Sequence, residues 1–247
     1  MGKPPTLLEA NRVFKYFGGL KAVSNVSFAL NQGEILGLIG PNGAGKTTLF
    51  NILSGFLPPD KGEIRFKGER ISRLKPHEIC KKGITRTFQI VKPFLHLTVL
   101  NNVAIGALNR TYSVREAEEK ALTILQQVGL EAKKDLPVEA LTLADRKRLE
   151  LARAMATEPQ LLLLDEVMAG LNPAEIQRFI ELLERINAGG MTILLIEHVM
   201  KAVMNLSQRV IVLNAGEVIA EGLPQEVTRN RQVIEAYLGE EFFVAQS

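Results

Sequence analysis

The spacing of hydrophobic and polar positions changes twice along the chain, and each change predicts a different kind of element. Near the N-terminus polar and apolar residues alternate over residues 8–14 and 25–30, which predicts half-buried strands on either side of a turn at residues 17–19. From about residue 98 to residue 157 apolar residues recur at helical spacing, and after Pro159 strands and helices alternate again. Strand–helix alternation with an all-helical interruption predicts a parallel-sheet core that carries a helical insert.

Short apolar runs mark the strands of this expected core. Residues 34–39 end in a continuous apolar run that predicts a buried strand, and a helix is expected to start near Thr48. The further expected strands cover residues 63–67, 161–164, 192–196, 209–214 and 217–220, and the further expected helices cover residues 173–187 and 199–206. The fold class is therefore α/β.

Composition limits the functional classes. The 247 residues are enough for one large domain or a core with a subdomain, and 46% hydrophobic with 23% charged residues is typical of a globular protein. No apolar stretch approaches the roughly 20 residues that span a bilayer, and the N-terminus lacks the apolar core of a secretory signal. The lone Cys80 excludes an intrachain disulfide, fits a reducing cytosol and is a poor candidate for a nucleophile. A net charge of +3 is too weakly basic to predict a nucleic-acid partner, although it suits an anionic membrane surface.

Residues 40–47, Gly-Pro-Asn-Gly-Ala-Gly-Lys-Thr, fit the phosphate-binding pattern G-x-x-x-x-G-K-[ST]. They lie between the strand expected at 34–39 and the next helix, so backbone N–H groups and the positive end of the helix dipole are directed at one point. The expected nucleotide contacts are Asn42, Gly43, Ala44, Gly45, Lys46, Thr47 and Thr48. Lys46 is expected to reach the β and γ phosphates, and the Thr47 hydroxyl is expected to bind Mg²⁺. The pattern predicts that the chain binds a nucleoside triphosphate.

The apolar strand at residues 161–164 ends in two acids, Asp165 and Glu166. Ligands of α/β sheets bind at the carboxyl ends of the strands. We therefore predict that Asp165 holds Mg²⁺ and that Glu166 orients and deprotonates the attacking water. The alternative interpretation is that the acids cap the helix that follows.

Together these motifs resemble those of the ATP-binding subunit of an ATP-binding cassette (ABC) transporter, and the resemblance covers nearly the whole chain. It implies a RecA-like P-loop NTPase core with an N-terminal antiparallel β subdomain, formed by residues 1–88 and 159–247, and an inserted α-helical signature subdomain at residues 89–158. It also implies ATP and Mg²⁺ as bound groups.

The same resemblance assigns roles to residues outside the phosphate loop. Gln89 matches the loop that senses Mg²⁺ and the γ phosphate, and His198 matches the switch histidine that hydrogen-bonds the γ phosphate. Residues 169–172 match the loop that crosses between two subunits. Phe17 aligns with the aromatic residue that stacks on adenine; Tyr16 is the neighbour that could replace it, and core packing is the alternative for Phe17.

The signature of the family departs from its usual Leu-Ser-Gly-Gly-Gln, because residues 141–145 here read Leu-Thr-Leu-Ala-Asp. Thr142 keeps a hydroxyl that can donate to a phosphate. Ala144 keeps the backbone N–H but adds a Cβ, which is costly if the site needs a positive φ. Asp145 brings an acid near a polyanion, and the basic residues 146–148 are expected to offset it. Two interpretations stay open: a working variant, which we favour, or a weakened ATP site.

The implied partners are a second ABC ATPase subunit, transmembrane permease subunits and, indirectly, a periplasmic or extracellular binding protein. The implied location is cytoplasmic, on the inner face of the cell membrane. Residues 17–23, 86–89, 169–173 and 234–240 resemble the ATPase of branched-chain amino-acid importers. Importers of urea or short amides and the lipopolysaccharide export ATPase remain alternatives.

Other functional classes remain to be separated from a transporter ATPase. A non-transport ABC ATPase of DNA repair or of the ribosome usually carries a long coiled-coil insert or two cassettes, and neither is present. A GTPase would need a guanine-reading Asn-Lys-x-Asp run, which is absent, and a small-molecule kinase would lack the matches at Gln89 and His198. The atypical signature also leaves open a regulatory protein that binds ATP without hydrolysing it.

Overall fold

A central sheet organises the protein, for which a computed structural model describes residues 4–87 and 93–237. Its strand order is β10-β9-β3-β8-β7-β6, and every neighbouring pair is parallel except β10 with β9. The strands are β3 (Ile35–Ile39), β6 (Ile84–Arg86), β7 (Leu161–Asp165), β8 (Thr192–Ile196), β9 (Arg209–Asn214) and β10 (Glu217–Gly222). Every residue of β3, β7 and β8 is buried, which explains why their sequences are continuous apolar runs.

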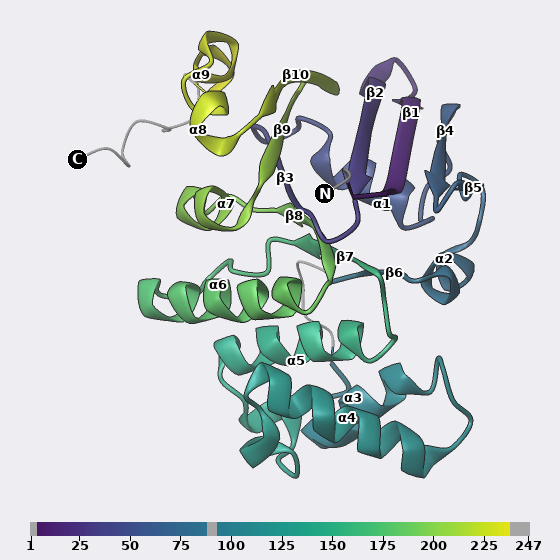
Figure 1. The fold of residues 1–247 in the computed structure, drawn as a ribbon, viewed down its shortest axis with the longest axis vertical. Coiled ribbons are helices and arrows are strands. Elements are labelled where there is room, and N and C mark those ends of the chain that lie inside the picture. The colour runs from purple at the N-terminus through teal and green to yellow at the C-terminus, as the bar shows by residue number, and fades with distance from the viewer. Residues whose placement is uncertain (1–3, 88–92, 238–247) are drawn as a thin grey trace.

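A second, antiparallel sheet lies beside the first (Figure 1), in the order β2-β1-β4-β5. Its strands are β1 (Thr6–Phe17), β2 (Leu20–Asn31), β4 (Lys61–Phe66) and β5 (Glu69–Arg70). β1 and β2 alternate buried and exposed positions and pair through contacts such as Val13 with Val26. Helix α1 (Lys46–Leu53) lies between the two sheets.

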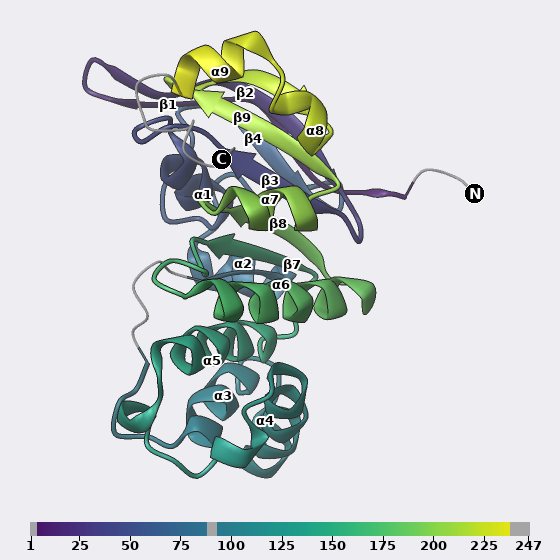
Figure 2. The same cartoon turned by 90° about the vertical axis from the view of Figure 1, so that its left-hand side faces the viewer.

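The central sheet divides the apolar interior because successive side chains of a strand point to opposite faces. On one face Leu36, Leu161 and Leu194 pack with the antiparallel sheet and with Phe50 of α1. On the other face the alternate residues, such as Leu162 and Ile193, pack against α6 (Pro173–Ala188). Figure 2 shows α6 and α7 (Met200–Leu206) on one side of these strands.

The helices between β6 and β7 form the lower part of the molecule in Figure 1. They are α3 (Val99–Ala107), α4 (Val114–Val128) and α5 (Leu143–Met155), with the short 3-10 turns η1 (Glu131–Lys133) and η2 (Val138–Ala140) between α4 and α5. Side chains such as Val103, Leu125 and Leu149 join their interior to that of α6. The helical insert is thus observed in the predicted place.

Several differences from the sequence expectations have physical reasons. β1 and β2 extend to the turn at residues 18 and 19 because cross-strand pairing continues past the alternating stretch, as in the pair Phe17–Leu20. The hydrophobic pattern did not predict α2 (Pro76–Lys82), α8 (Pro224–Val227) or α9 (Arg231–Tyr237). They have four to seven residues, so that at most about two turns are available in which a helical period can show.

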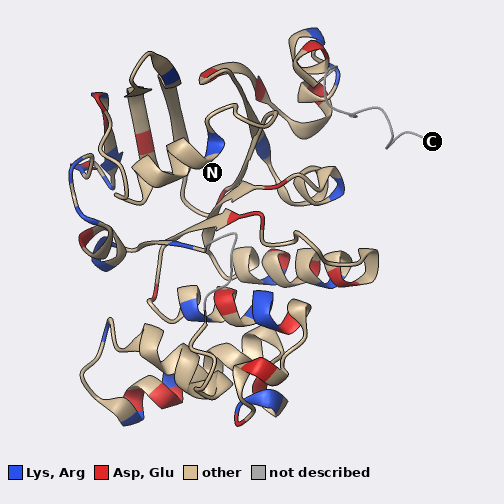
Figure 3. Ribbon diagram, turned by 180° about the vertical axis from the view of Figure 1, so that it is seen from behind, with Lys and Arg blue, Asp and Glu red and all other residues tan. Residues whose placement is uncertain are grey.

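In the described part of the chain, no helix is long and apolar enough to cross a membrane. Basic and acidic residues are interspersed over the surface (Figure 3), and pairs such as Arg115–Glu119 and Lys120–Glu116 run along α4.

Candidate nucleotide-binding site

The loop after β3 is shaped by two glycines at which a side chain would be strained. Gly40 has a φ of 153° and Gly45 a φ of 101°, conformations that L side chains rarely adopt. A Cβ atom at Gly40 would lie 2.1 Å from the Leu213 carbonyl oxygen, and one at Gly45 would lie 2.3 Å from that of Ala22. The loop therefore fits closely between β9 and β2, and the chain enters α1 at Lys46. A helix start of this kind presents N–H groups to an anion.

The Lys46 side chain folds back over this loop. Its Nζ donates hydrogen bonds to the carbonyl oxygens of Gly40 (2.5 Å) and Pro41 (2.9 Å), and the residue is buried. Among the other predicted contacts, Asn42, Gly43 and Thr47 are exposed, Gly45 and Thr48 are half-buried, and Ala44 is buried. The ammonium group is thus held at the loop that the sequence assigned to phosphate.

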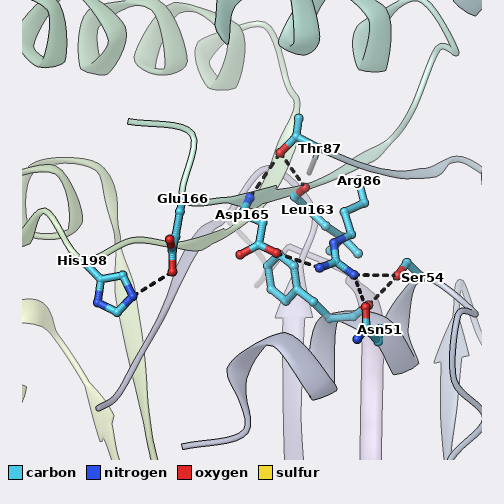
Figure 4. Close-up of polar contacts among 9 residues, drawn as sticks. Asn51, Ser54, Arg86, Thr87, Leu163, Asp165, Glu166 and His198 are labelled. Atoms are coloured by element: carbon cyan, nitrogen blue, oxygen red, sulfur yellow. Dashed lines mark hydrogen bonds and ion pairs between the residues drawn. The ribbon is translucent and has the colours of Figure 1, made fainter. Parts of the chain in front are cut away.

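Asp165 is fixed between the phosphate-loop helix and the edge strand of the central sheet (Figure 4). Its Oδ2 accepts a hydrogen bond from Arg86 at 2.7 Å, and its backbone N–H donates to the Thr87 hydroxyl at 3.2 Å. Arg86 also donates to Oδ1 of Asn51 on α1 at 2.6 Å. The carboxylate therefore lies beside the helix that starts at the phosphate loop.

The donor chemistry fits the predicted magnesium site. Mg²⁺ prefers oxygen ligands and is usually held by one or two carboxylates together with substrate phosphates. Asp165 and the exposed Thr47 hydroxyl supply such oxygens, whereas Gln89 lies outside the described residues. Among the residues the structure describes, no cluster of three or more His, Cys, Asp or Glu forms an all-protein metal cage.

Glu166 and His198 meet at the carboxyl ends of neighbouring strands (Figure 4). Nε2 of His198 lies 2.8 Å from Oε1 of Glu166, and the His198 side chain is about half exposed. Glu166 has a φ of 49°, and its N–H donates to the carbonyl oxygen of Ile196 at 2.9 Å. The alternative role as a helix cap is wrong, because α6 is capped by Asn172, whose side chain accepts from the Glu175 N–H.

Glu197 is a buried acid that the sequence analysis missed. Its Oε1 accepts a hydrogen bond from the Met168 N–H at 2.8 Å, which ties the end of β8 to the segment after Glu166. Burial and the nearby Glu166 carboxylate raise the pKa of Glu197 to about 7, against hydrogen bonds from the Met168, His198 and Val199 N–H groups that lower it. No motif marks this residue, because its contact is made across 29 positions of sequence.

Glu197→Gln is expected to remove part of the pH dependence of stability. Between about pH 4.5 and pH 7 the folded protein keeps the Glu197 proton and the unfolded chain loses it, so stability falls as the pH rises through this window. At about 1.4 kcal/mol per pH unit, the wild-type free energy of unfolding should drop between pH 5 and pH 8 by on the order of 2 kcal/mol more than that of the variant. Urea unfolding at pH 5 and at pH 8 measures this difference in the free energy of unfolding, and Glu184→Gln at an exposed position is the control. Parallel profiles for wild type and Glu197→Gln would contradict the assignment.

The atypical signature begins α5 without backbone strain. The Thr142 hydroxyl accepts from the Asp145 N–H at 3.2 Å as the N-cap and donates to the Asp145 carboxylate at 2.8 Å. Ala144 is the second residue of α5 and is not among the residues with positive φ. The added Cβ of Ala144 therefore carries no φ penalty, although its contact with ATP stays a prediction.

The charge of Asp145 is compensated mainly by a residue outside the basic triplet. Lys133 of η1 forms an ion pair with Asp145 at 2.5 Å. Burial raises the pKa of Asp145, but the Lys133 and Thr142 hydrogen bonds and the charges of Lys133 and Arg148 outweigh it and lower the pKa overall. The expectation that residues 146–148 offset this acid is thus correct only for Arg148.

Phe17 is the more accessible of the two candidate adenine partners. It ends β1 at the hairpin, is 46% exposed, and has Lys15 Nζ 5.8 Å from its ring centroid. Tyr16 is half-buried and stacks on Phe14 at a centroid distance of 6.2 Å. The exposure of the Phe17 side chain argues against the alternative that Phe17 is a core residue.

The hairpin turn between β9 and β10 also braces the phosphate loop. The Gly216 N–H donates to the Ala44 carbonyl oxygen at 3.0 Å, and the Gly216 carbonyl oxygen accepts from the Ser24 N–H at 2.8 Å. The sequence predicted a turn here but gave no sign of its contact with the nucleotide loop. This bridge joins the phosphate loop to β2, the strand paired with the one that ends at Phe17.

A phosphate loop between a buried strand and a helix, with two acids at the end of a parallel strand, defines a P-loop nucleoside-triphosphatase. The sequence pattern of the family described as ABC transporter matches residues 23–169, and the chain belongs to this family as an ATPase subunit. The high-affinity branched-chain amino acid transport ATP-binding protein LivG of Salmonella typhimurium is 43% identical over 95% of this chain and 98% of that protein.

Three further matches extend this finding. Residues 217–242 match the pattern of a branched-chain amino acid ATP-binding cassette transporter. The crystal structure of an ABC-transporter ATP-binding cassette in its ADP conformation superposes with a TM-score of 0.88, at 33% identity, over 96% of this chain and 100% of that one. A dimeric cassette bound to ADP and phosphate superposes with a TM-score of 0.79 at 26% identity, over 88% of this chain and 99% of that one.

Proposed function

We propose that this chain is the ATP-hydrolysing subunit of an importer for branched-chain or other hydrophobic amino acids, on the inner face of the cell membrane. The observation that carries the proposal is the match at residues 217–242, which takes in the β10, α8 and α9 segment. The full-length likeness to LivG supports the same cargo class. No residue of the nucleotide site bears on the cargo, so the cargo rests on these likenesses.

At the nucleotide site, we assign each chemical task to one or two residues. Lys46, which contacts the Gly40 and Pro41 carbonyl oxygens, would bind the β and γ phosphates of ATP, and Thr47 and Asp165 would hold Mg²⁺. That ion, when bound, neutralises charge on the transferred phosphoryl group. Glu166 orients the attacking water and takes its proton, and His198, hydrogen-bonded to Glu166, contacts the γ phosphate. Phe17 stacks on adenine.

The signature at Thr142 completes the nucleotide site of a second ATPase subunit. The start of α5 presents N–H groups and a capped helix end to phosphate. The dimeric cassette among the similar structures supports pairing of two such subunits, and we assign the pairing a head-to-tail arrangement. ATP then stabilises the closed dimer, and hydrolysis releases it.

The permease subunits dock beside the helical insert, which we assign to residues 89–158 with the core at 1–88 and 159–247. A cleft of about 620 Å³ lies between the start of α5 and the segment after Glu166. Its lining includes Leu95, Leu143, Ala169 and Gly170. Phe94, Leu95 and Leu143 are each more than 40% exposed, and exposed apolar side chains around a cleft suit a protein partner. Because Ala169 and Gly170 belong to the loop that we assign to the crossing between subunits, we assign this cleft to the second ATPase subunit and not to the permease. A binding protein outside the membrane joins the assembly only through the permease.

The test is to tag the chain in its native host, extract the membrane in mild detergent, and identify the co-purifying proteins by mass spectrometry. We expect two membrane subunits and a second ATPase. Uptake of labelled leucine, urea and alanine is then compared between the wild type, a deletion strain and that strain carrying Lys46→Ala. Leucine uptake should be lost in the last two.

The other outcomes identify other functions. Loss of urea uptake alone would favour an importer of urea or short amides. Co-purification with copies of this chain and an export permease would favour lipopolysaccharide export. Recovery without any membrane protein would overturn the transport proposal in favour of a non-transport ABC ATPase.

A further inference from the structure

Arg86 is a buried cation in the nucleotide site to which the sequence motifs give no role. It is the last residue of β6, and its side chain is 6% exposed, the same as that of its partner Asp165. Its guanidinium carbon lies 5.5 Å from the centroid of the Phe50 ring on α1. A charge removed from water to this extent is stable only with a compensating partner.

The contacts of Arg86 join three segments of the site. One terminal nitrogen donates to Asp165 Oδ2 at 2.7 Å, and the other donates to Asn51 Oδ1 at 2.6 Å and to Ser54 Oγ at 3.5 Å. Figure 4 shows the guanidinium between these side chains, with the second carboxylate oxygen of Asp165 directed away from it. The planar fork of arginine is suited to hold two acceptors at once.

The backbone beside Arg86 fixes Asp165 further. The Thr87 N–H donates to the Leu163 carbonyl oxygen at 2.9 Å, and the Thr87 hydroxyl accepts from the Asp165 N–H at 3.2 Å. Main chain and side chain of Asp165 are therefore both held by residues of the β6 end. Arg86 leaves one carboxylate oxygen for another cation.

We propose that Arg86 is a positioning residue that compensates the Asp165 carboxylate whenever metal is absent, and so lets the site bind nucleotide without Mg²⁺. The proposal rests on the proposed metal role of Asp165. Without Arg86 the buried carboxylate would face the phosphates uncompensated, and the two negative groups would repel each other. Nucleotide binding would then require the metal.

The experiment measures the affinity of the purified chain for a fluorescent ATP analogue, once in excess Mg²⁺ and once in EDTA. Arg86→Met should weaken binding in EDTA by roughly tenfold or more relative to binding in Mg²⁺. Arg86→Lys keeps the charge, so its ratio of affinity in Mg²⁺ to affinity in EDTA should stay near that of the wild type. The matched control is Arg110→Met, because half-buried Arg110 donates to the carbonyl oxygens of Thr157, Lys81 and Cys80 and forms no ion pair with a carboxylate of the described residues.

The double variant Arg86→Met/Asp165→Asn isolates the charge interaction. With the carboxylate neutralised, no uncompensated charge faces the phosphates, so binding in EDTA should return to within about threefold of wild type. Thermal unfolding without nucleotide gives an independent readout: Arg86→Met should melt well below wild type and the double variant should recover. If Arg86→Met does not fold, recovery of folding in the double variant carries the same information.

Three results would overturn the proposal. Equal weakening of Arg86→Met in Mg²⁺ and in EDTA would make Arg86 merely structural, as would identical behaviour of Arg86→Met and Arg110→Met. A double variant that does not fold would show that the fold, and not the carboxylate, requires the arginine. Failure of the wild type to bind nucleotide even in Mg²⁺ would instead count against the proposed nucleotide site.

Discussion

Glu166→Gln is expected to slow ATP hydrolysis by roughly 100- to 10,000-fold, the range that general-base catalysis contributes, while MgATP still binds. The amide keeps the size of the side chain and an oxygen that can accept from His198, but it cannot take the proton of the attacking water. With hydrolysis blocked, the ATP-bound dimer should accumulate.

Phosphate release at saturating MgATP measures turnover, and gel filtration with light scattering in ATP measures the dimer. Glu184→Gln on the exposed side of α6 is the matched control, since it removes an equal charge from an exposed position late in that helix. Unchanged turnover in Glu166→Gln would remove Glu166 from the role of base. Reduced turnover together with lost binding would point to a structural role instead.

Strands β3, β7 and β8 could be predicted because they are buried at every position and nearly all of their residues are apolar. Residues 161–164 and 192–196 stood out for this reason, and β7 and β8 are observed there. The helical insert was predictable because its period is repeated over α3, α4 and α5. The short helices α2 and α8 have seven and four residues, which is at most about two turns in which a period can show.

The phosphate loop could be predicted for a different reason: its contacts are local. Gly40, Gly45 and Lys46 belong to one segment whose spacing encodes the geometry. Arg86 and Glu197 act instead on partners 79 and 29 positions away. Sequence spacing carries no information about such pairs until the order of strands in the sheet is known. Arg86 and Asp165 come together because β6 pairs with β7 in the folded protein.

These two kinds of residue meet around the ends of β7 and β8. Local motifs contain Lys46, Asp165 and Glu166. A long-range contact from Arg86 holds Asp165, and a long-range contact from Glu197 holds the segment that follows Glu166. Arg86 and Glu197 are both buried ionisable side chains, and the free energy of such a side chain depends on the charged or polar groups that contact it. The nucleotide site is thus sensitive to substitutions that lie outside every motif.

Lys46→Ala is expected to abolish measurable nucleotide binding. The ammonium group is the only side-chain cation that the phosphate-loop segment itself supplies, and it already lies over the loop at the Gly40 and Pro41 carbonyls. Hydrogen bonds to charged groups contribute about 1.5–3 kcal/mol each, so loss of two such bonds to the β and γ phosphates should weaken ATP binding by about a hundredfold or more. Isothermal titration calorimetry with ATP in Mg²⁺ measures the change.

The matched control for this substitution is Lys201→Ala, on the exposed surface of α7. It should bind ATP as the wild type does. Thermal unfolding without nucleotide shows whether Lys46→Ala is still folded after losing its bonds to the loop carbonyls, so that a loss of affinity is interpreted only for folded protein. Tight ATP binding by folded Lys46→Ala would undo the phosphate-loop assignment, since the remaining backbone N–H groups would then suffice to hold the nucleotide.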